Sequence, residues 1–211
     1  MRGFFQGLIR SVYYTNRDQF HRLFLNILHP ASSSDSSRHV QRFMTGFEQL
    51  QINSIPRHGR SMKNVVVSMD FLEFPARYTC DGGNHSPRLT LKGLQAASVA
   101  VMVFNPFEKS CCSFTPWIIW NIPPVRIIPE DIPAEGIVTA PIPATQGVND
   151  YGTIGYKAPC PPHGQMIRYQ FKVYGLDTML GLDPGSDKRQ LINAMKGHVV
   201  QFGETAAICS R

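Results

Sequence analysis

A proline-rich loop that runs straight into an alternating segment constrains this chain more than any other feature. The stretch from Asn149 to Tyr174 reads NDYGTIGYKAPCPPHGQMIRYQFKVY. Its glycines loosen the backbone and its prolines lack amide donors, so the first half cannot form a regular element. In the second half Tyr169, Phe171 and Val173 alternate with polar residues, which predicts a half-buried strand. A stiff loop that is held in position by a core strand is a suitable place for a small binding site.

Apolar runs bounded by turn residues predict further strands at residues 64–69, 98–104, 117–121 and 198–209. One helix is expected late in the chain, with Ser186 as its N-cap and Lys196 as its last residue. Gly197 would end this helix. Several strands with a single clear helix indicate a mainly β domain.

The positive charge of the chain is unevenly distributed. The formal net charge is +6, but residues 1–61 contain eight arginines, no lysine and three acidic residues, so residues 62–211 carry only +1. A nearly neutral domain lacks the electrostatic footprint of a nucleic-acid-binding protein. No apolar run approaches the roughly 20 residues that a membrane-spanning helix needs. We therefore expect neither nucleic acid nor a membrane span.

Residues 1–61 are expected to be separate from a domain at 62–211. They contain two amphipathic stretches, 4–14 and 20–28, followed by a serine-rich linker. Three interpretations stay open: a genuine extension, a targeting segment suggested by the arginine-rich and acid-poor composition, or an upstream stretch outside the natural product. Met62 followed by an apolar strand would suit a natural start.

The stretch from Asn149 resembles the phosphatidylethanolamine-binding proteins, in particular the prokaryotic YbhB/YbcL branch called Raf-kinase-inhibitor-like. That branch typically reads Asn-Asp-(Phe/Tyr)-Gly, then Gly-Tyr-x-x-Pro-Cys-Pro-Pro, then His-Arg-Tyr. Further matching blocks occur in order along residues 62–211: YTCDG at 78–82, NHSP at 84–87, WIIWNIPP at 117–124, YGLD at 174–177, KGHV at 196–199 and the final SR. Ordered blocks are more specific than any single motif.

The resemblance implies a fold and a site. The fold is a mainly β, antiparallel sandwich with a large central sheet, a smaller sheet and peripheral helices. The site is a small pocket for anions such as phosphate or a phosphorylated head group. The residues that the resemblance assigns to this pocket are Asn105, Pro106, Pro116, Trp117, Tyr151, Pro159, Cys160, Pro161, His163, Ile167, Arg168 and Tyr169.

This sequence departs from the family at the polar positions. The Asp-Pro-Asp segment of the family is replaced by Asn105-Pro106-Phe107, and two family histidines are replaced by Pro116 and Ile167. The remaining pocket residues, which form the frame of the site, can be carried over from the family. The anion-binding chemistry cannot. Either the pocket is more apolar and takes another ligand, or His85 or His163 supplies the missing donors.

Each singled-out residue also has a purely structural interpretation. Arg168 suits a structural ion pair, and Trp117 and Tyr169 suit a hydrophobic core. His163, between Pro162 and Gly164, suits a solvated loop histidine.

The five cysteines do not resemble a secreted disulfide framework, because their number is odd and their spacing irregular. The resemblance places Cys80 and Cys160 in loops around the pocket, so we expect these two residues to lie close together. A zinc site made of these cysteines with His85 and His163 is the less favoured alternative.

Enzyme signatures such as Gly-x-Ser-x-Gly, a phosphate-binding loop or His-Glu-x-x-His are absent from the sequence. We therefore expect a cytoplasmic, non-enzymatic binding or regulatory module without a cofactor or metal. Its partner would be a small phosphorylated ligand, a phospholipid head group or a protein, with kinase or protease inhibition as one outcome. The alternatives are an enzyme or metal protein that uses Cys160 and His163, and a degenerate member that keeps only the fold.

Overall fold

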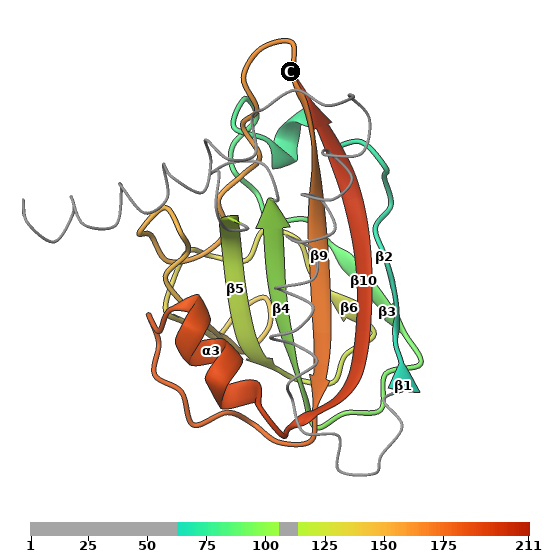
Figure 1. Ribbon diagram of the computed structural model, residues 1–211, viewed down its shortest axis with the longest axis vertical. Coiled ribbons are helices and arrows are strands. Elements are labelled where there is room, and N and C mark those ends of the chain that lie inside the picture. Colours follow the sequence, from blue (N-terminus) through green and yellow to red (C-terminus); the bar gives the residue numbers. More distant parts are fainter. Residues whose placement is uncertain (1–62, 106–113) are drawn as a thin grey trace, which may run out of the picture. The chain divides into compact units, whose positions relative to one another are not determined.

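The computed structural model describes residues 63–105 and 114–211, which form two β-sheets with one α-helix and one short 3₁₀ helix (Figure 1). The elements in chain order are β1 Lys63–Asn64, β2 Val66–Ser68, the 3₁₀ helix η1 Ala76–Tyr78, β3 Leu89–Lys92, β4 Ser98–Asn105, β5 Phe114–Ile122, β6 Ile127–Ile128, β7 Ile137–Val138, β8 Ala144–Gln146, β9 Met166–Leu176, α3 Lys188–Met195 and β10 Val199–Ser210.

The large sheet has seven strands in the order β1-β10-β9-β4-β5-β8-β7, and the small sheet has the order β2-β3-β6. All pairs are antiparallel except β1 with β10, which is parallel. This arrangement confirms the predicted mainly β fold with a large and a small sheet. Among residues 63–105 and 114–211, no helix has the length and apolarity needed to cross a membrane.

The first predicted strand, residues 64–69, is in fact two strands in different sheets. Its amide at Val65 donates to the carbonyl of Phe202 at 3.0 Å, after which the chain passes from the large sheet to the small one. The close approach requires a glycine opposite, because a Cβ at Gly203 would lie 2.0 Å from the carbonyl oxygen of Val65. An apolar run alone does not reveal such a change of sheet.

Two hydrophobic clusters stabilise the domain. One lies between the sheets and includes Leu89, Val101 and Trp117, and the other lies beneath α3 and includes Trp120 and Leu191. Because both faces of the large sheet are covered, all eight residues of β4 are buried. Fully buried strands read as continuous apolar runs, as residues 99–104 do.

The helix α3 starts one residue later than predicted. Asp187, not Ser186, is the N-cap: its side chain accepts from the amide of Gln190, whose side chain accepts from the amide of Asp187 in return. This reciprocal pair satisfies two amides that the helix itself cannot. The side chain of Ser186 instead donates to the carbonyl of Asp183 at 2.7 Å, one residue before the position that caps the helix.

The predicted alternation of β9 holds only for its first half. Arg168 is exposed and Tyr169 buried, but Lys172 is 7% exposed. The reason is that β9 is an interior strand, between β10 and β4, and its second half has both faces covered. The Lys172 ammonium lies 4.6 Å from the ring centroid of Phe104, a contact that makes burial of the lysine stem tolerable.

Candidate ligand site and its disulfide-linked loops

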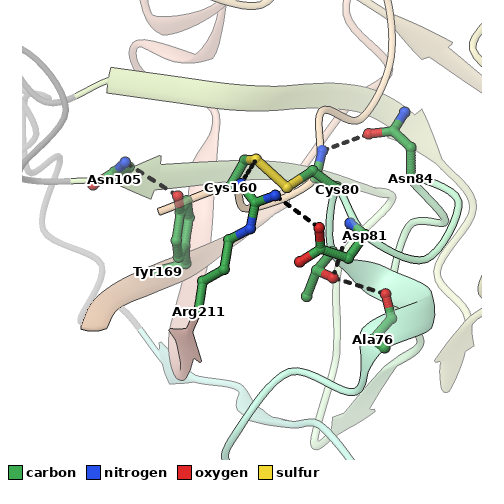
Figure 2. The surroundings of a disulfide bond; sticks show 10 residues. Ala76, Cys80, Asp81, Asn84, Asn105, Cys160, Tyr169 and Arg211 are labelled. Atoms are coloured by element: carbon green, nitrogen blue, oxygen red, sulfur yellow. Dashed lines mark hydrogen bonds and ion pairs between the residues drawn. A yellow bond between two sulfur atoms is a disulfide. The ribbon is translucent and has the colours of Figure 1, made fainter. Parts of the chain in front are cut away.

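The predicted pocket residues on β4 and β9 meet at one end of the large sheet. Because Phe104 pairs with Gln170, the next residue, Asn105, comes opposite Tyr169. The amide nitrogen of Asn105 donates to the Tyr169 hydroxyl at 3.3 Å, and both residues are buried (Figure 2). An uncharged amide therefore stands where the family pattern has a carboxylate.

Pro116 and Ile167 are both buried, and neither side chain carries a hydrogen-bond donor. The backbone around them is tightly held: the amide of Lys157 donates to the carbonyl of Pro116 at 3.0 Å. The neighbouring Thr115 is fully buried, and its hydroxyl has no hydrogen-bond partner. Pro106 lies outside the described residues.

Trp117 is a core residue, which confirms its structural interpretation. It is fully buried and meets Tyr156 edge to face, with ring centroids 5.5 Å apart. The indole nitrogen donates to Gln146 at 2.7 Å, and the Gln146 side-chain nitrogen donates to the carbonyls of Pro133 and Glu135 at 2.6 and 2.9 Å. Sequence reasoning missed Gln146, since nothing in its proline-rich surroundings marks it as buried.

Tyr151 and Lys157 are exposed residues, one aromatic and one basic, and we call this pair the rim of the candidate site. Its side chain is 38% exposed and packs edge to face against Phe114 at a centroid distance of 4.5 Å. The ammonium of Lys157 lies 5.9 Å from the centroid of the Tyr151 ring. Asn149 fixes the loop, because its side-chain oxygen accepts from the amides of Tyr151 and Thr153 at 3.0 and 3.2 Å.

The proline loop presents buried and exposed residues in turn. Pro159 and Pro161 are buried, whereas Cys160 and His163 are exposed, as is Arg168 on β9. Cys160 forms a disulfide with Cys80 at a Cα–Cα distance of 5.3 Å, which confirms the predicted proximity. The disulfide occupies both sulfurs, so the four-ligand zinc arrangement is not formed. Within residues 63–105 and 114–211, no cluster of three or more metal-ligating side chains occurs.

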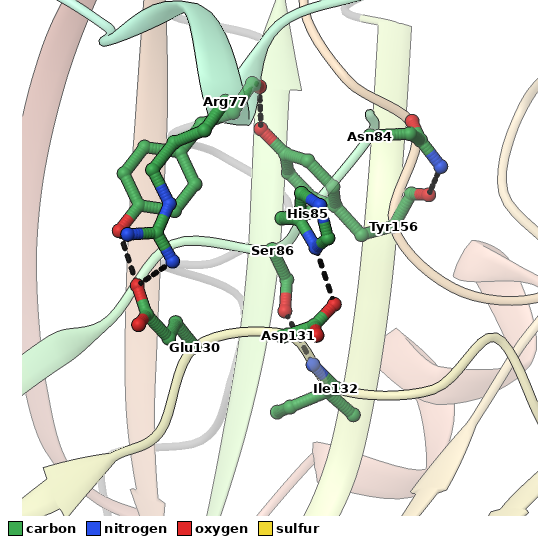
Figure 3. A network of polar contacts seen from close by, with 9 residues as sticks. Arg77, Asn84, His85, Ser86, Glu130, Asp131, Ile132 and Tyr156 are labelled. Carbon is green, nitrogen blue, oxygen red and sulfur yellow. Dashed lines mark hydrogen bonds and ion pairs between the residues drawn. The ribbon is translucent and has the colours of Figure 1, made fainter. Parts of the chain in front are cut away.

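Hydrogen bonds fasten the loop around Cys80 to the proline loop on both sides of the disulfide. The amide of Cys80 donates to the carbonyl of Pro159 at 3.0 Å. Asn84, which has a positive φ of 63°, donates through its side chain to the carbonyl of Tyr156 at 3.1 Å (Figure 3). Its side-chain oxygen accepts from the amide of Ala158 at 2.6 Å. Asparagine tolerates this left-handed conformation better than most residues.

Arg211 completes the attachment of these loops. Its guanidinium donates to the Cys160 sulfur at 3.2 Å and pairs with Asp81 at 2.9 Å (Figure 2). The carbonyl of Arg211 accepts from the amide of Gly164 at 2.6 Å. The terminal block containing Arg211 matched the family pattern, but nothing in the sequence indicated that this residue contacts the disulfide.

His85 is not well placed to replace a missing anion donor. Its Nδ1 lies 2.6 Å from Asp131, so a carboxylate already occupies that side of the ring (Figure 3). A nearby negative charge disfavours a second anion.

Nearby, Glu130 accepts from the hydroxyl of Tyr78 and pairs with Arg77 at 2.9 Å. Burial, aided by the hydrogen bond to Glu130, raises the pKa of Tyr78. The same hydrogen bond lowers the pKa of Glu130, which keeps this carboxyl ionised.

The sequence model described as phosphatidylethanolamine-binding protein matches residues 63–210. The chain belongs to this family. It is 48% identical over 140 residues to a UPF0098 protein of Pyrococcus horikoshii, covering 65% of this chain and 70% of the relative. It is 38% identical over 105 residues to the UPF0098 protein YbcL of Escherichia coli, covering 48% and 57% of the two chains.

Solved structures of family members agree with this assignment. The crystal structure of E. coli YbcL superimposes with a TM-score of 0.62 at 28% identity, over 70% of this chain and 99% of that chain. A phosphatidylethanolamine-binding protein homolog from Chlamydia trachomatis gives a TM-score of 0.62 at 29% identity, over 71% and 99% of the two chains. The predicted prokaryotic branch of the family is thereby confirmed.

Proposed function

We propose that this member of the phosphatidylethanolamine-binding protein family is a non-enzymatic module that binds a phosphorylated organic molecule, such as a phospholipid head group. Family membership supports a binding module in general terms. The observation that carries the specific proposal is the replacement of charged and donor groups by Asn105, Pro116 and Ile167, all of which are buried.

The frame favours an organic ligand over a bare anion. A hydrogen bond to a charged group contributes about 1.5–3 kcal/mol, and this frame lacks two such side-chain donors. The basic groups on the rim, such as Lys157, are exposed, and exposed ion pairs typically contribute only about 0.2–1 kcal/mol each. Affinity must then come from apolar and aromatic contact, to which Tyr151, 38% exposed, would contribute.

The test is calorimetric titration of the full chain with inorganic phosphate and with phosphoethanolamine. We expect phosphate to bind no more tightly than about 1 mM, which corresponds to about −4.1 kcal/mol, and phosphoethanolamine to bind more tightly. Tight phosphate binding would contradict the proposal and would point to His163 or backbone amides of the proline loop as the anion donors.

A variant that restores the family histidines sharpens the test. Pro116→His with Ile167→His should improve phosphate binding by one to several orders of magnitude, because two donors to a charged group return. The matched control is Ile137→His, which adds an imidazole at an exposed residue of β7 and should leave phosphate binding unchanged. A thermal melt checks that the loss of the fixed φ of Pro116 has not disturbed the fold.

A protein partner, including a kinase or protease that this domain inhibits, is the second candidate. It is favoured by two large apolar side chains near the same end of β10: Leu72 is 83% exposed and Met166 is 68% exposed. The carbonyl of Leu72 accepts from the amide of Ile208, and Met166 pairs with Ser210. Enzyme-inhibition assays with the unmodified chain and with Leu72→Ser/Met166→Ser would test this candidate, which fails if both proteins behave alike.

A cytoplasmic location is also part of the proposal, although disulfides usually form in oxidising compartments. Trapping thiols with an alkylating agent in intact cells measures the fraction of Cys80 that is oxidised. A substantial reduced fraction is expected in the cytoplasm, and complete oxidation would contradict that location.

A further inference from the structure

The disulfide between Cys80 and Cys160 joins two exposed loops at the candidate site. Both cysteines are exposed, and the bond closes a separation of 80 residues along the chain. An exposed disulfide can be reached by an external thiolate, whereas Cys209, the free cysteine of the described residues, is 2% exposed. An incoming thiolate can attack either of the two bonded sulfurs.

The surroundings of the two sulfurs differ in charge. The Arg211 guanidinium donates to the sulfur of Cys160 at 3.2 Å, and its other nitrogen pairs with Asp81 at 2.9 Å. A guanidinium beside a sulfur stabilises the thiolate that forms when the bond breaks, and a stabilised thiolate leaves faster. Asp81 follows Cys80 directly, but Arg211 offsets its charge, so this carboxylate does not strongly repel an anionic thiolate near Cys80.

We propose that Cys80 is a thiol-exchange site, at which a thiolate of a monothiol or dithiol reductant attacks the Cys80 sulfur and expels Cys160 as a thiolate held by Arg211. One sulfur–sulfur bond forms between the reductant and Cys80 as the Cys80–Cys160 bond breaks, and the electron pair of the broken bond remains on Cys160. A second thiolate of the reductant then attacks the reductant sulfur of the mixed disulfide and releases Cys80. The protein gains two electrons, and the two reductant thiols, from one dithiol or two monothiols, are oxidised to a disulfide.

Exchange at this bond would loosen the site without dismantling the fold. The amide of Cys80 and the side chain of Asn84 keep their hydrogen bonds to the proline loop, so the loops stay docked but lose the covalent bond between them. Lys157, on the rim of the candidate site, lies within this docked segment. The proposal concerns the chemistry of the disulfide alone and holds whichever ligand the site takes.

The experiment exposes the oxidised full chain to reduced glutathione, then blocks free thiols with N-ethylmaleimide and maps the peptides by mass spectrometry. Cys111 and Cys112, outside the described residues, are replaced by serine in every sample. Burial raises the pKa of the Cys209 thiol, so this residue should stay unreactive while the protein is folded. We expect glutathione on Cys80 to exceed glutathione on Cys160 by about tenfold.

Three variants test whether Arg211 directs the exchange. Arg211→Gln should bring the ratio of the two adducts close to one, and Arg211→Lys should keep part of the preference, because the charge remains. Arg189→Gln removes an exposed arginine of α3 and is the matched control, with the preference unchanged. Equal adducts, or more adducts on Cys160, in the unmodified chain would overturn the proposal whether or not the Arg211 variants fold. So would an unaltered preference in folded Arg211→Gln.

Discussion

Replacing Gln146 with leucine should destabilise this domain far more than its position in a proline-rich connection suggests. Gln146 is fully buried, accepts from the Trp117 indole at 2.7 Å and donates to the carbonyls of Pro133 and Glu135. Leucine has a similar size but can neither donate nor accept. The substitution therefore isolates the hydrogen bonds, with little change in packed volume.

The expected cost follows from the groups left behind. The Trp117 nitrogen is fully buried, so its loss of an acceptor should cost about 1–3 kcal/mol. The two carbonyls belong to Pro133, which is half-buried, and Glu135, which is exposed, so each should add only about 0.5–1 kcal/mol. The sum is roughly 2–5 kcal/mol, a large part of the 5–15 kcal/mol that typically stabilises a folded protein.

Urea unfolding of the full chain, followed by tryptophan fluorescence, would measure this cost. The control is Gln165→Leu at an exposed loop residue, which should change the free energy of unfolding by less than about 0.5 kcal/mol.

A double-mutant cycle isolates the indole bond. Trp117→Phe removes the orphaned donor, so Trp117→Phe/Gln146→Leu should be more stable, by about 1–2 kcal/mol, than the sum of the single effects predicts. Additive effects, or a Gln146→Leu protein as stable as the control, would refute the reasoning.

Three further outcomes are expected. Burial raises the pKa of Tyr156 well above 10.0. The stabilisation from keeping this hydroxyl protonated is complete below about pH 10 and falls as the pH rises. In urea titrations between pH 9 and about pH 11, Tyr156→Phe should therefore lose less stability than the unmodified chain. Asp187→Ala should lower the free energy of unfolding by about 1 kcal/mol through loss of the N-cap of α3, and Asp187→Asn should recover most of it. A chain starting at Met62 should stay soluble and melt cooperatively; aggregation of this chain but not of the full one would place the domain boundary elsewhere.

The sequence was most informative where one physical signal dominated. The buried run of β4 and the alternation at the start of β9 are direct results of apolar periodicity, and both were predicted. Lys172 was misread as a surface residue, because a sequence pattern cannot show that a neighbouring strand supplies an aromatic ring for the ammonium. Asp187 and Ser186 are both good N-cap residues, and only the reciprocal bond with Gln190 decides between them.

Prediction of the site depended on the family resemblance. Nothing in the spacing of Cys80 and Cys160 indicates a bond across 80 residues, whereas the ordered motifs placed both cysteines around one pocket. The sequence does not reveal the roles of Gln146 and Arg211, because each depends on partners far away in sequence. Gln146 binds Trp117, and Arg211 binds Cys160 and Asp81. Such contacts exist only once the sheet has formed.

The order of strands in the large sheet also has a consequence for synthesis on the ribosome. β4 pairs with β5, which follows it closely, but its other neighbour is β9, Met166–Leu176. That neighbour is complete only about 70 residues after β4, which at roughly 5–20 residues per second leaves the second edge of β4 unpaired for about 4–14 s. A largely apolar strand with an open edge readily pairs with other chains. During this interval the nascent chain avoids pairing with other chains only if the open edge of β4 is shielded until β9 emerges.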